Sequence, residues 1–333
     1  MRFPIAMTAS IAGYLAKKKL SRTTRYPMVL MLEPLHACNL TCTGCGRIRE
    51  YESTIKQKLS IDECLEAVDE CGAPVVSICG GEPMIYPGIG ELTAKILERK
   101  KTVYLCTNGM FIRKKVHEFK PSNRFFFNVH LDGMRASHDL AVERDGVFDD
   151  AIDGIKAAKD AGFLVCTNTT VFHETDMDEL EQMYAFLTEL GVDGFMISPG
   201  YSYSAVAVKE IFMTREDIRA KFRRAEAMFR KYRFNTSPIY LEFLQGKREL
   251  KCTAWASPTR NILGWKGPCY LITDAHHATF GDLLNNTKWE NYGPGNDPRC
   301  ENCMMHSGFE TSAAVGVNGK LGDTLKMIKW QFV

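Results

Sequence analysis

Short apolar runs alternate with helical patterns from residue 28 to about residue 232. This alternation is typical of βα units built around a parallel sheet. We expect strands over residues 28–35, 75–79, 102–106, 125–131, 163–171 and 194–198. We expect helices over residues 60–72, 88–99, 111–119, 148–161 and 178–190. The six units predict an α/β fold with fewer strands than the eight of a closed barrel.

The composition and the length of the predicted elements change after a charged amphipathic helix that we expect over residues 215–232. Beyond Pro238 the elements become short, Gly and Pro become frequent, and further cysteines appear. We therefore predict three parts, with boundaries that follow these changes. They are an apolar and basic N-terminal segment (1–26), the βα domain (27–235) and a C-terminal extension (236–333).

Net charge, cysteine content and the length of apolar runs limit the classes of function that the chain can have. The chain has 333 residues and a net charge of +2, so no bulk electrostatic field favours nucleic acid as a partner. It has twelve cysteines and no secretory signal, from which we expect a reducing, cytoplasmic location. No apolar run reaches the roughly 18 residues of a membrane span.

The N-terminal segment has two interpretations. Residues 3–15 are largely apolar, and Lys17, Lys18, Lys19, Arg22 and Arg25 follow directly. An apolar segment beside a basic cluster can lie in the headgroup region of an anionic membrane. It can equally be a helix that packs under the sheet and ends in a solvated basic turn. Peripheral attachment to the inner face of the cytoplasmic membrane stays open at this point.

Three cysteines in one short loop carry the strongest chemical signal. Cys38, Cys42 and Cys45 follow the first apolar run. A protein-held [4Fe–4S] cluster normally takes four thiolates, so three leave one iron open for another ligand. A zinc site would need a fourth ligand, for which His36 is badly placed. Three thiols cannot pair as disulfides among themselves, and incidental buried cysteines rarely cluster in a polar loop.

Further polar residues and turns follow the other predicted strands. Chemistry in parallel α/β folds collects at the carboxyl ends of the strands, where these residues lie. The glycines of the first such turn allow close backbone approach to a ligand, and its proline fixes the exit of the turn. The candidate site residues are Gly80, Gly81, Glu82, Pro83, Asn108, His130, Asp132, Asn168 and Ser198.

Cys106 ends the third predicted strand and has two interpretations. A thiol S–H is a good hydrogen-atom donor, so a chemical role in a site at this strand end is one interpretation. A small buried residue that fills the strand is the alternative, because free cysteine is among the most buried residue types.

The extension holds four cysteines, Cys252, Cys269, Cys300 and Cys303, of which the last two have ligand spacing. Four thiols in a small extension can hold a second iron–sulfur cluster or a structural zinc ion, with His306 as a further ligand candidate. They can also be unliganded thiols of a lid.

The loop C-x-x-x-C-x-x-C after an apolar strand, followed one strand later by GGEP, resembles the radical S-adenosylmethionine (SAM) enzymes. The runs LEPLHACNLTCTGCGRIREY, CTNG and KCTAWASPTRNILGWKGPCY resemble, over the whole chain, the adenosylhopane synthase family of bacterial hopanoid biosynthesis. The resemblance implies a partial (β/α)6 TIM-like barrel with a small cysteine-containing C-terminal extension. It also implies a [4Fe–4S] cluster on the cysteine triplet and SAM held by the GGEP turn and the later strand ends. The family usually has an aromatic residue just before the third cysteine, where this chain has Gly44.

The resemblance further implies a transferase in which the 5′-deoxyadenosyl radical adds to the alkene of diploptene and forms adenosylhopane. Its partners would be SAM, this hopanoid alkene and a one-electron donor such as flavodoxin or ferredoxin. The alternative is a radical SAM enzyme that abstracts hydrogen from another substrate, such as a peptide. A non-enzymatic iron–sulfur protein for electron transfer or sensing is a third reading.

Overall fold

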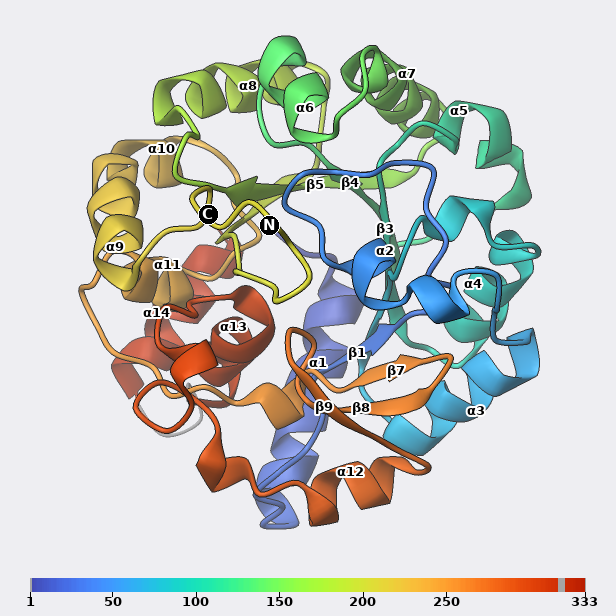
Figure 1. The fold of residues 1–333 in the computed structure, drawn as a ribbon, viewed down its shortest axis with the longest axis vertical. Coiled ribbons are helices and arrows are strands. Elements are labelled where there is room, and N and C mark those ends of the chain that lie inside the picture. Colours follow the sequence, from blue (N-terminus) through green and yellow to red (C-terminus); the bar gives the residue numbers. More distant parts are fainter. Residues whose placement is uncertain (1, 317–320, 333) are drawn as a thin grey trace.

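The computed structural model describes residues 2–316 and 321–332. One nine-stranded sheet, in the order β6-β5-β4-β3-β2-β1-β7-β8-β9, forms the centre of the molecule (Figure 1). Strands β1 to β6 pair in parallel, and β8 and β9 run antiparallel to their neighbours. The strands are β1 (Val29–Leu32), β2 (Val75–Ile78), β3 (Thr102–Thr107), β4 (Phe125–His130), β5 (Leu164–Val171), β6 (Gly194–Pro199), β7 (Thr259–Asn261), β8 (Gly264–Pro268) and β9 (Thr273–His277).

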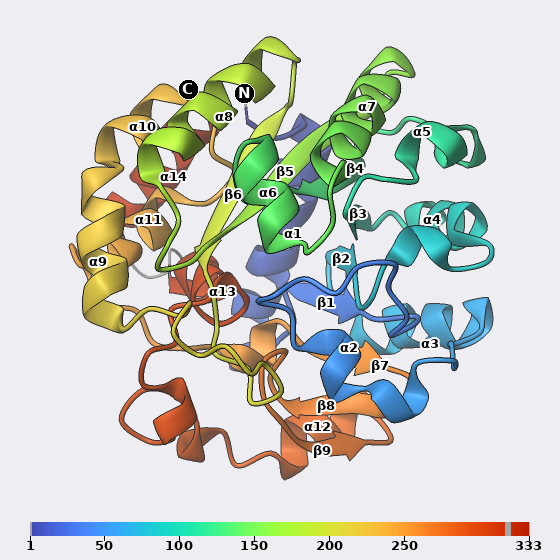
Figure 2. The ribbon, with the colours of Figure 1, turned by 45° about the horizontal axis from the view of Figure 1, so that its top comes forward.

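The α-helices lie around and over the sheet (Figures 1 and 2). They are α1 (Ile5–Leu20), α2 (Arg47–Glu50), α3 (Ile61–Cys71), α4 (Ile89–Glu98), α5 (Ile112–Lys115), α6 (Arg135–Ala141), α7 (Val147–Asp160), α8 (Met177–Glu189), α9 (Arg215–Arg224), α10 (Glu226–Lys231), α11 (Pro238–Leu244), α12 (Phe280–Asn286), α13 (His306–Gly316) and α14 (Leu321–Phe332). Helix α3 begins with a capping box of Ser60 and Glu63 and ends at Gly72, whose φ is 68°.

The predicted α/β class is confirmed, and all six predicted parallel strands are present. Several details differ from the prediction. The first strand ends at Leu32 instead of residue 35, because Pro34 has no N–H for a ladder. The predicted helix 215–232 is interrupted at Ala225, between α9 and α10. The short strands β7 to β9 were not predicted, and they extend the sheet beyond β1.

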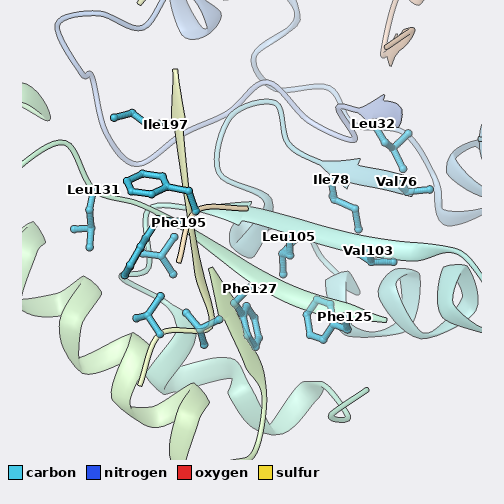
Figure 3. Close-up of a cluster of buried hydrophobic side chains, with 14 of the residues drawn as sticks. Leu32, Val76, Ile78, Val103, Leu105, Phe125, Phe127, Leu131, Phe195 and Ile197 are labelled. Carbon is cyan, nitrogen blue, oxygen red and sulfur yellow. The ribbon is translucent and has the colours of Figure 1, made fainter. Parts of the chain in front are cut away.

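Side chains along each strand point alternately to the two sides of the sheet, so one set forms the core and the other faces the site. Figure 3 shows one set of side chains packed between the sheet and its helices, among them Val103 and Leu105 on β3 and Phe125 and Phe127 on β4. The intervening side chains point to the opposite side of the sheet because successive residues of a strand alternate. This second set is more polar and includes Cys106 and Asn128, which are register partners.

Helix α1 packs against the sheet through buried Met7, which clusters with Phe126 and Cys166. The N-terminal segment thus has the packed helix that one of the two interpretations predicts. The two described ends of the chain meet, since the backbone N–H of Arg2 donates to the carbonyl of Gln331 at 2.8 Å. No helix among residues 2–316 and 321–332 is long and apolar enough to span a bilayer.

Candidate active site

A cavity of about 280 Å³ opens at the carboxyl ends of the parallel strands. The loop after β1, the loop after β6 and α13 lie over this end of the sheet (Figures 1 and 2). All candidate residues of the βα domain except Pro83 line the cavity. They are Cys38, Cys42, Cys45, Gly80, Gly81, Glu82, Cys106, Asn108, His130, Asp132, Asn168 and Ser198.

The cysteine loop runs from β1 to α2 and is held by Arg49. Its guanidinium donates to the carbonyls of Cys45 at 2.5 Å and Cys42 at 3.2 Å. The backbone N–H of Leu40 points at the sulfur of Cys38 at 3.5 Å, and burial raises the pKa of Cys38 to about 11. Three thiols from one loop thus face one cavity, and metal binding there would release their protons.

The donor set of this loop fits a cluster with three protein ligands, since soft thiolates suit iron–sulfur centres. As the side chains stand, no group of three or more His, Cys, Asp and Glu in the described part of the chain is arranged to hold a metal ion, and that includes this triplet. When bound, a [4Fe–4S] cluster would supply one electron and an open iron at this position.

The two glycines of the GGEP turn are required by the cysteine loop. A Cβ on Gly81 would lie 1.9 Å from the carbonyl oxygen of Ala37, and one on Gly80 would lie 2.4 Å from that of Leu35. The N–H groups of Gly81 and Glu82 donate to the same carbonyls, at 3.1 and 2.8 Å. The close approach anticipated for a ligand is therefore made by the protein's own backbone.

Glu82 and Asn108 fix the relative position of three strand ends. The buried carboxylate of Glu82 accepts from the hydroxyl of Thr107 at 2.7 Å and from the N–H of Asn108 at 2.8 Å. The amide of Asn108 donates to the side chain of Asn39 in the cysteine loop at 2.9 Å. Burial raises the pKa of Glu82 despite these donors. Both residues thus position the loop that carries the three thiols.

His130 and Asp132 form a pair at the end of β4. The Nε2 of His130 lies 2.8 Å from the carboxylate of Asp132, whose other oxygen accepts from the N–H of Thr170 at 2.7 Å. Burial disfavours the imidazolium, but the charge of Asp132 and its hydrogen bond outweigh burial, so the pKa of His130 is raised. When its imidazole is protonated, His130 therefore forms an ion pair with Asp132 at one wall of the cavity.

Cys106, on β3, lines the same cavity as the cysteine loop. Its sulfur is 3.2 Å from the hydroxyl of Ser77 on β2 and 3.5 Å from the amide nitrogen of Asn128 on β4. Burial raises the pKa of Cys106, which keeps the group as S–H at neutral pH. Cys64, Cys71, Cys79 and Cys166 are all buried, and of these four Cys79 also lines the cavity.

Two aromatic side chains complete the cavity, and the sequence had not assigned either of them to the place beside the third cysteine. A Cβ on Gly44 would lie 2.5 Å from Cζ of Phe172, and one on Gly46 would lie 2.8 Å from Tyr203. Phe172 follows β5 and Tyr203 follows β6, and both line the cavity. The signal that could have located Phe172 was Gly44, where the resemblance predicts an aromatic ring and the chain has none.

The C-terminal extension supplies part of the cavity wall. Tyr270, Met305 and His306 line it. The hydroxyl of Ser198 accepts from the N–H of His306 at 3.3 Å and lies 3.3 Å from the hydroxyl of Tyr240. The side chain of Ser198 therefore holds the extension against β6.

A buried charge network, also not predicted, joins the extension to the cysteine loop. The Nε of Arg47 lies 3.2 Å from the carboxylate of Glu33. The guanidinium also donates to the carbonyl of Tyr270 at 2.5 Å and stacks on the ring of Tyr270, with its Cζ 3.9 Å from the ring centroid. The fully buried Lys266 lies 3.3 Å from Glu50 and donates to the same carbonyl at 2.9 Å. Burial lowers the pKa of Lys266 to about 8.

The four cysteines of the extension, Cys252, Cys269, Cys300 and Cys303, line one separate, smaller cavity. Leu271 and Ile272 line this cavity and also a third one, of about 550 Å³, which shares Gly200, Tyr201 and Tyr203 with the cysteine-triplet cavity. His306 lines the triplet cavity instead.

Comparison with known protein families finds two families that match separate parts of the chain. The family described as Radical SAM superfamily matches residues 32–187. These residues are a radical SAM domain. A family described as Domain of unknown function (DUF3463) matches residues 195–327. The radical SAM family uses a [4Fe–4S] cluster and SAM, the two cofactors predicted from the cysteine loop and the GGEP turn.

The relatives of this radical SAM domain carry names that describe different reactions or pathways. The chain is 27% identical over 179 residues to the AdoMet-dependent heme synthase of Methanosarcina barkeri, covering 52% of this chain and 51% of that protein. It is 26% identical over 307 residues to the antilisterial bacteriocin subtilosin biosynthesis protein AlbA of Bacillus subtilis, covering 84% of this chain and 66% of that protein. The chain spans about half the length of the first curated relatives it matches.

The fold also matches solved structures. Streptococcus suis SuiB bound to the precursor peptide SuiA superposes with a TM-score of 0.65 at 16% identity, covering 92% of this chain and 76% of that chain. At this identity the likeness concerns the fold, and it confirms the α/β architecture of the radical SAM type.

Proposed function

We propose that this protein is a radical SAM adenosyltransferase that adds the 5′-deoxyadenosyl group to the exocyclic alkene of diploptene and forms adenosylhopane. The proposal rests on the resemblance of the whole chain to that family, and it is supported by one observation above the others. The thiol of Cys106 faces the same cavity as the cysteine triplet and is kept protonated by burial.

The triplet Cys38, Cys42 and Cys45 would hold the cluster, and the bound cluster would supply the electron that cleaves SAM to methionine and the adenosyl radical. The ammonium of SAM needs acceptors, which the carbonyls of the turn from Gly80 to Pro83 provide. Asn108, His130, Asp132, Asn168 and Ser198 belong to the surrounding wall. His130 can neutralise a carboxylate when it is protonated, because its pKa is raised.

Cys106 would complete the reaction by donating a hydrogen atom. Addition of the adenosyl carbon to the alkene forms one C–C bond and leaves an unpaired electron on the neighbouring carbon. The S–H bond of Cys106 breaks, its hydrogen forms a C–H bond there, and a thiyl remains. One electron from the external donor and one solvent proton restore the thiol. The contacts with Ser77 and Asn128, at 3.2 and 3.5 Å, orient the sulfur.

Phe172 would replace the aromatic residue that the resemblance places before the third cysteine. Its ring fills the space over Gly44 and contacts Gly200 as well, where a Cβ would lie 2.7 Å away. A ring held between two glycines is fixed in orientation, and it offers a flat face for the adenine. The cavity of about 550 Å³ next to it, with Met213, Leu271 and Ile272 in its walls, would receive the hopanoid.

A membrane-resident alkene makes peripheral membrane attachment part of the proposal. On α14, Leu321, Leu325, Ile328 and Phe332 follow a helical repeat, and each is at least 50% exposed. On α1 the exposed positions Ile5, Ala9, Ala12, Ala16 and Leu20 follow the same repeat.

The two helices touch, because the ring of Phe3 packs edge-on against Trp330 at 5.4 Å and Gln331 donates to Thr8 at 2.9 Å. The basic cluster of Lys17, Lys18, Lys19, Arg22 and Arg25 lies at the end of α1 and directly after it in the sequence. Apolar stripes beside such a cluster fit an anionic lipid surface.

The second candidate function is hydrogen abstraction from a peptide. It is favoured by the relative AlbA, named for subtilosin biosynthesis, and by the fold of SuiB, which was solved with a precursor peptide. Anaerobic incubation with SAM, dithionite and diploptene separates the functions. The proposal predicts an adenosylated lipid, whereas abstraction predicts unchanged diploptene, and an electron-transfer protein predicts intact SAM.

A further inference from the structure

The turn that follows β5 carries Phe172. The strand ends at Val171, and the N–H of Phe172 then donates to the hydroxyl of Thr175 at 2.8 Å. The N–H of Thr175 donates back to the carbonyl of Phe172 at 3.3 Å, and that of His173 donates to the carbonyl of Ile211 at 2.8 Å. The N–H groups of the turn therefore have partners, and its carbonyls need further donors from outside the strand ladder.

The half-buried Lys221 of α9 supplies these donors. Its ammonium donates to the carbonyls of His173 at 2.6 Å and Thr175 at 2.8 Å. A third hydrogen bond goes to the carbonyl of Phe172 at 3.1 Å. A lysine ammonium has three N–H donors, so all three serve this one turn. Hydrogen bonds from a charged donor are stronger than neutral ones, and three from one atom fix the shape of the turn.

Lys221 acts on the cofactor cavity from outside it. Its side chain lines a separate cavity of about 520 Å³, bordered by α8 and α9, instead of the cavity of the cysteine triplet. It also lies in residues 195–327, which the second family matches, whereas Phe172 lies in the radical SAM match over residues 32–187. The three hydrogen bonds thus join the two matched parts of the chain at a residue that lines the cofactor cavity.

The ring of Phe172 has little freedom once the turn is fixed. A Cβ on Gly44 would lie 2.5 Å from the ring, and one on Gly200 would lie 2.7 Å from it. The ring of Phe212 packs against it edge-on, with centroids 5.8 Å apart. Because this packing is close on several sides, a small shift of the turn would displace the ring relative to the cavity.

We propose that Lys221 is a positioning residue for SAM, because it holds the turn after β5 and so keeps the ring of Phe172 where it receives the adenine. The inference rests on the proposed function only for the role of Phe172 toward SAM, and it does not involve the alkene. Without the ammonium, three carbonyls lose their donor and the turn relaxes to bring them to water. SAM then binds more weakly, since its binding must also order the ring.

The effect of charge alone has the opposite sign. SAM is a sulfonium cation, and a variant that removes the ammonium of Lys221 removes a positive charge. Coulomb repulsion between the protein and SAM would then fall, which strengthens binding. Weaker binding by such a variant therefore reports the lost hydrogen bonds and not the lost charge.

The test measures SAM binding by isothermal titration of the full chain, reconstituted without oxygen and kept without reductant so that SAM stays intact. For Lys221→Met we expect the Kd to rise at least about fivefold, and no further than in Phe172→Ala. The control Lys156→Met, at an exposed lysine of α7, should keep the wild-type Kd. In the Phe172→Ala background, Lys221→Met should change the Kd by less than about twofold, because the ring through which it acts is gone.

A second measurement uses the unmodified holoprotein. If the hydrogen bonds of Lys221 favour SAM binding, SAM must favour those hydrogen bonds by the same factor. Saturating SAM should therefore slow acetylation of Lys221 by an activated acetyl ester at least about threefold, relative to Lys156, as read by peptide mass spectrometry. This measurement decides the case if Lys221→Met does not fold.

The proposal is overturned if Lys221→Met binds SAM like the wild type, or if its full effect persists in the Phe172→Ala background. It is equally overturned if SAM leaves the acetylation of Lys221 unchanged. Wild-type affinity of Phe172→Ala would remove the adenine role of the ring and this inference with it. The transferase proposal is tested separately, by the incubation with diploptene.

Discussion

The ring of Phe172 lies directly over Gly44, so close that a Cβ at position 44 would come within 2.5 Å of its Cζ. An aromatic side chain supplied from β5 thus occupies the place that the radical SAM resemblance assigns to the residue before the third cysteine. The ring contacts Phe212 edge-on, with centroids 5.8 Å apart, which keeps it in place.

Phe172→Ala should weaken SAM binding if the ring carries the adenine. Stacking of a base on an aromatic side chain is worth about 1–3 kcal/mol, so we expect the Kd for SAM to rise roughly 5- to 150-fold. Isothermal titration of the anaerobically reconstituted protein measures this. The control Phe186→Ala removes a half-buried ring of α8 that does not line the cavity, and its Kd should match the wild type. Equal affinity of the Phe172 variant and the wild type would refute the role.

Cys106→Ala should separate SAM cleavage from product formation. The cluster ligands are intact in this variant, so we expect methionine to form at close to the normal rate. The saturated adenosylated lipid should fall by at least about tenfold, because the carbon radical has lost its hydrogen donor. Chromatography with mass detection of both products gives the ratio, and Cys166→Ala, at a buried thiol of β5, is the control. Normal yield of saturated lipid from the Cys106 variant would rule out the donor role.

Arg47→Met should destabilise the protein more than a surface ion-pair variant does. The substitution leaves Glu33 buried beside His36, whose pKa is lowered to about 4 by burial and which therefore cannot supply a positive charge at neutral pH. Removing one partner of a buried pair typically costs about 3–5 kcal/mol.

The control for Arg47 is Arg99→Met, which breaks a more exposed pair with Asp69 at 2.9 Å and should cost at most about 1 kcal/mol. Denaturant unfolding gives both values. Similar losses in the two variants would contradict the assignment of Arg47 as the residue that fastens the extension to the cysteine loop.

Leu325→Glu combined with Ile328→Glu should reduce binding to anionic vesicles. Two carboxylates in the exposed stripe of α14 oppose both apolar insertion and the negative surface. We expect at least a fivefold lower fraction bound in flotation with phosphatidylglycerol vesicles. The control Ala220→Glu with Ala227→Glu adds the same charge at exposed positions near α9 and α10. A pair of variants that float equally well would show that α14 does not face the membrane.

The parallel part of the fold was predictable because its strands are apolar runs bounded by turns. Val103, Leu105, Phe125 and Phe127 pack outward in alternation, and that pattern is visible in the sequence. Strands β7 and β9 were not predictable. Thr259–Asn261 has three residues, and Thr273–His277 is a polar edge strand that pairs only because the neighbouring strands are already there.

The candidate site also has a part that the local sequence pattern predicts and a part that it does not. Residues at strand ends, such as His130 and Asn168, were predictable because parallel strands bring their carboxyl ends to one edge. The place of Phe172 over Gly44 and the contacts of the buried Lys266 were not, because they join segments far apart in the chain and leave no local pattern. The roles of the strand-end residues stay predictions until variants are measured.

The most direct measurement follows the adenosyl group itself. Reconstituted protein is incubated without oxygen with diploptene, reductant and SAM that carries carbon-13 in the ribose, and the label is counted in the lipid and in free 5′-deoxyadenosine. The account predicts that most of the label enters a lipid with the mass of diploptene plus one deoxyadenosyl group and one hydrogen. Release of the label as free 5′-deoxyadenosine, in step with turnover and with diploptene unchanged, would contradict it.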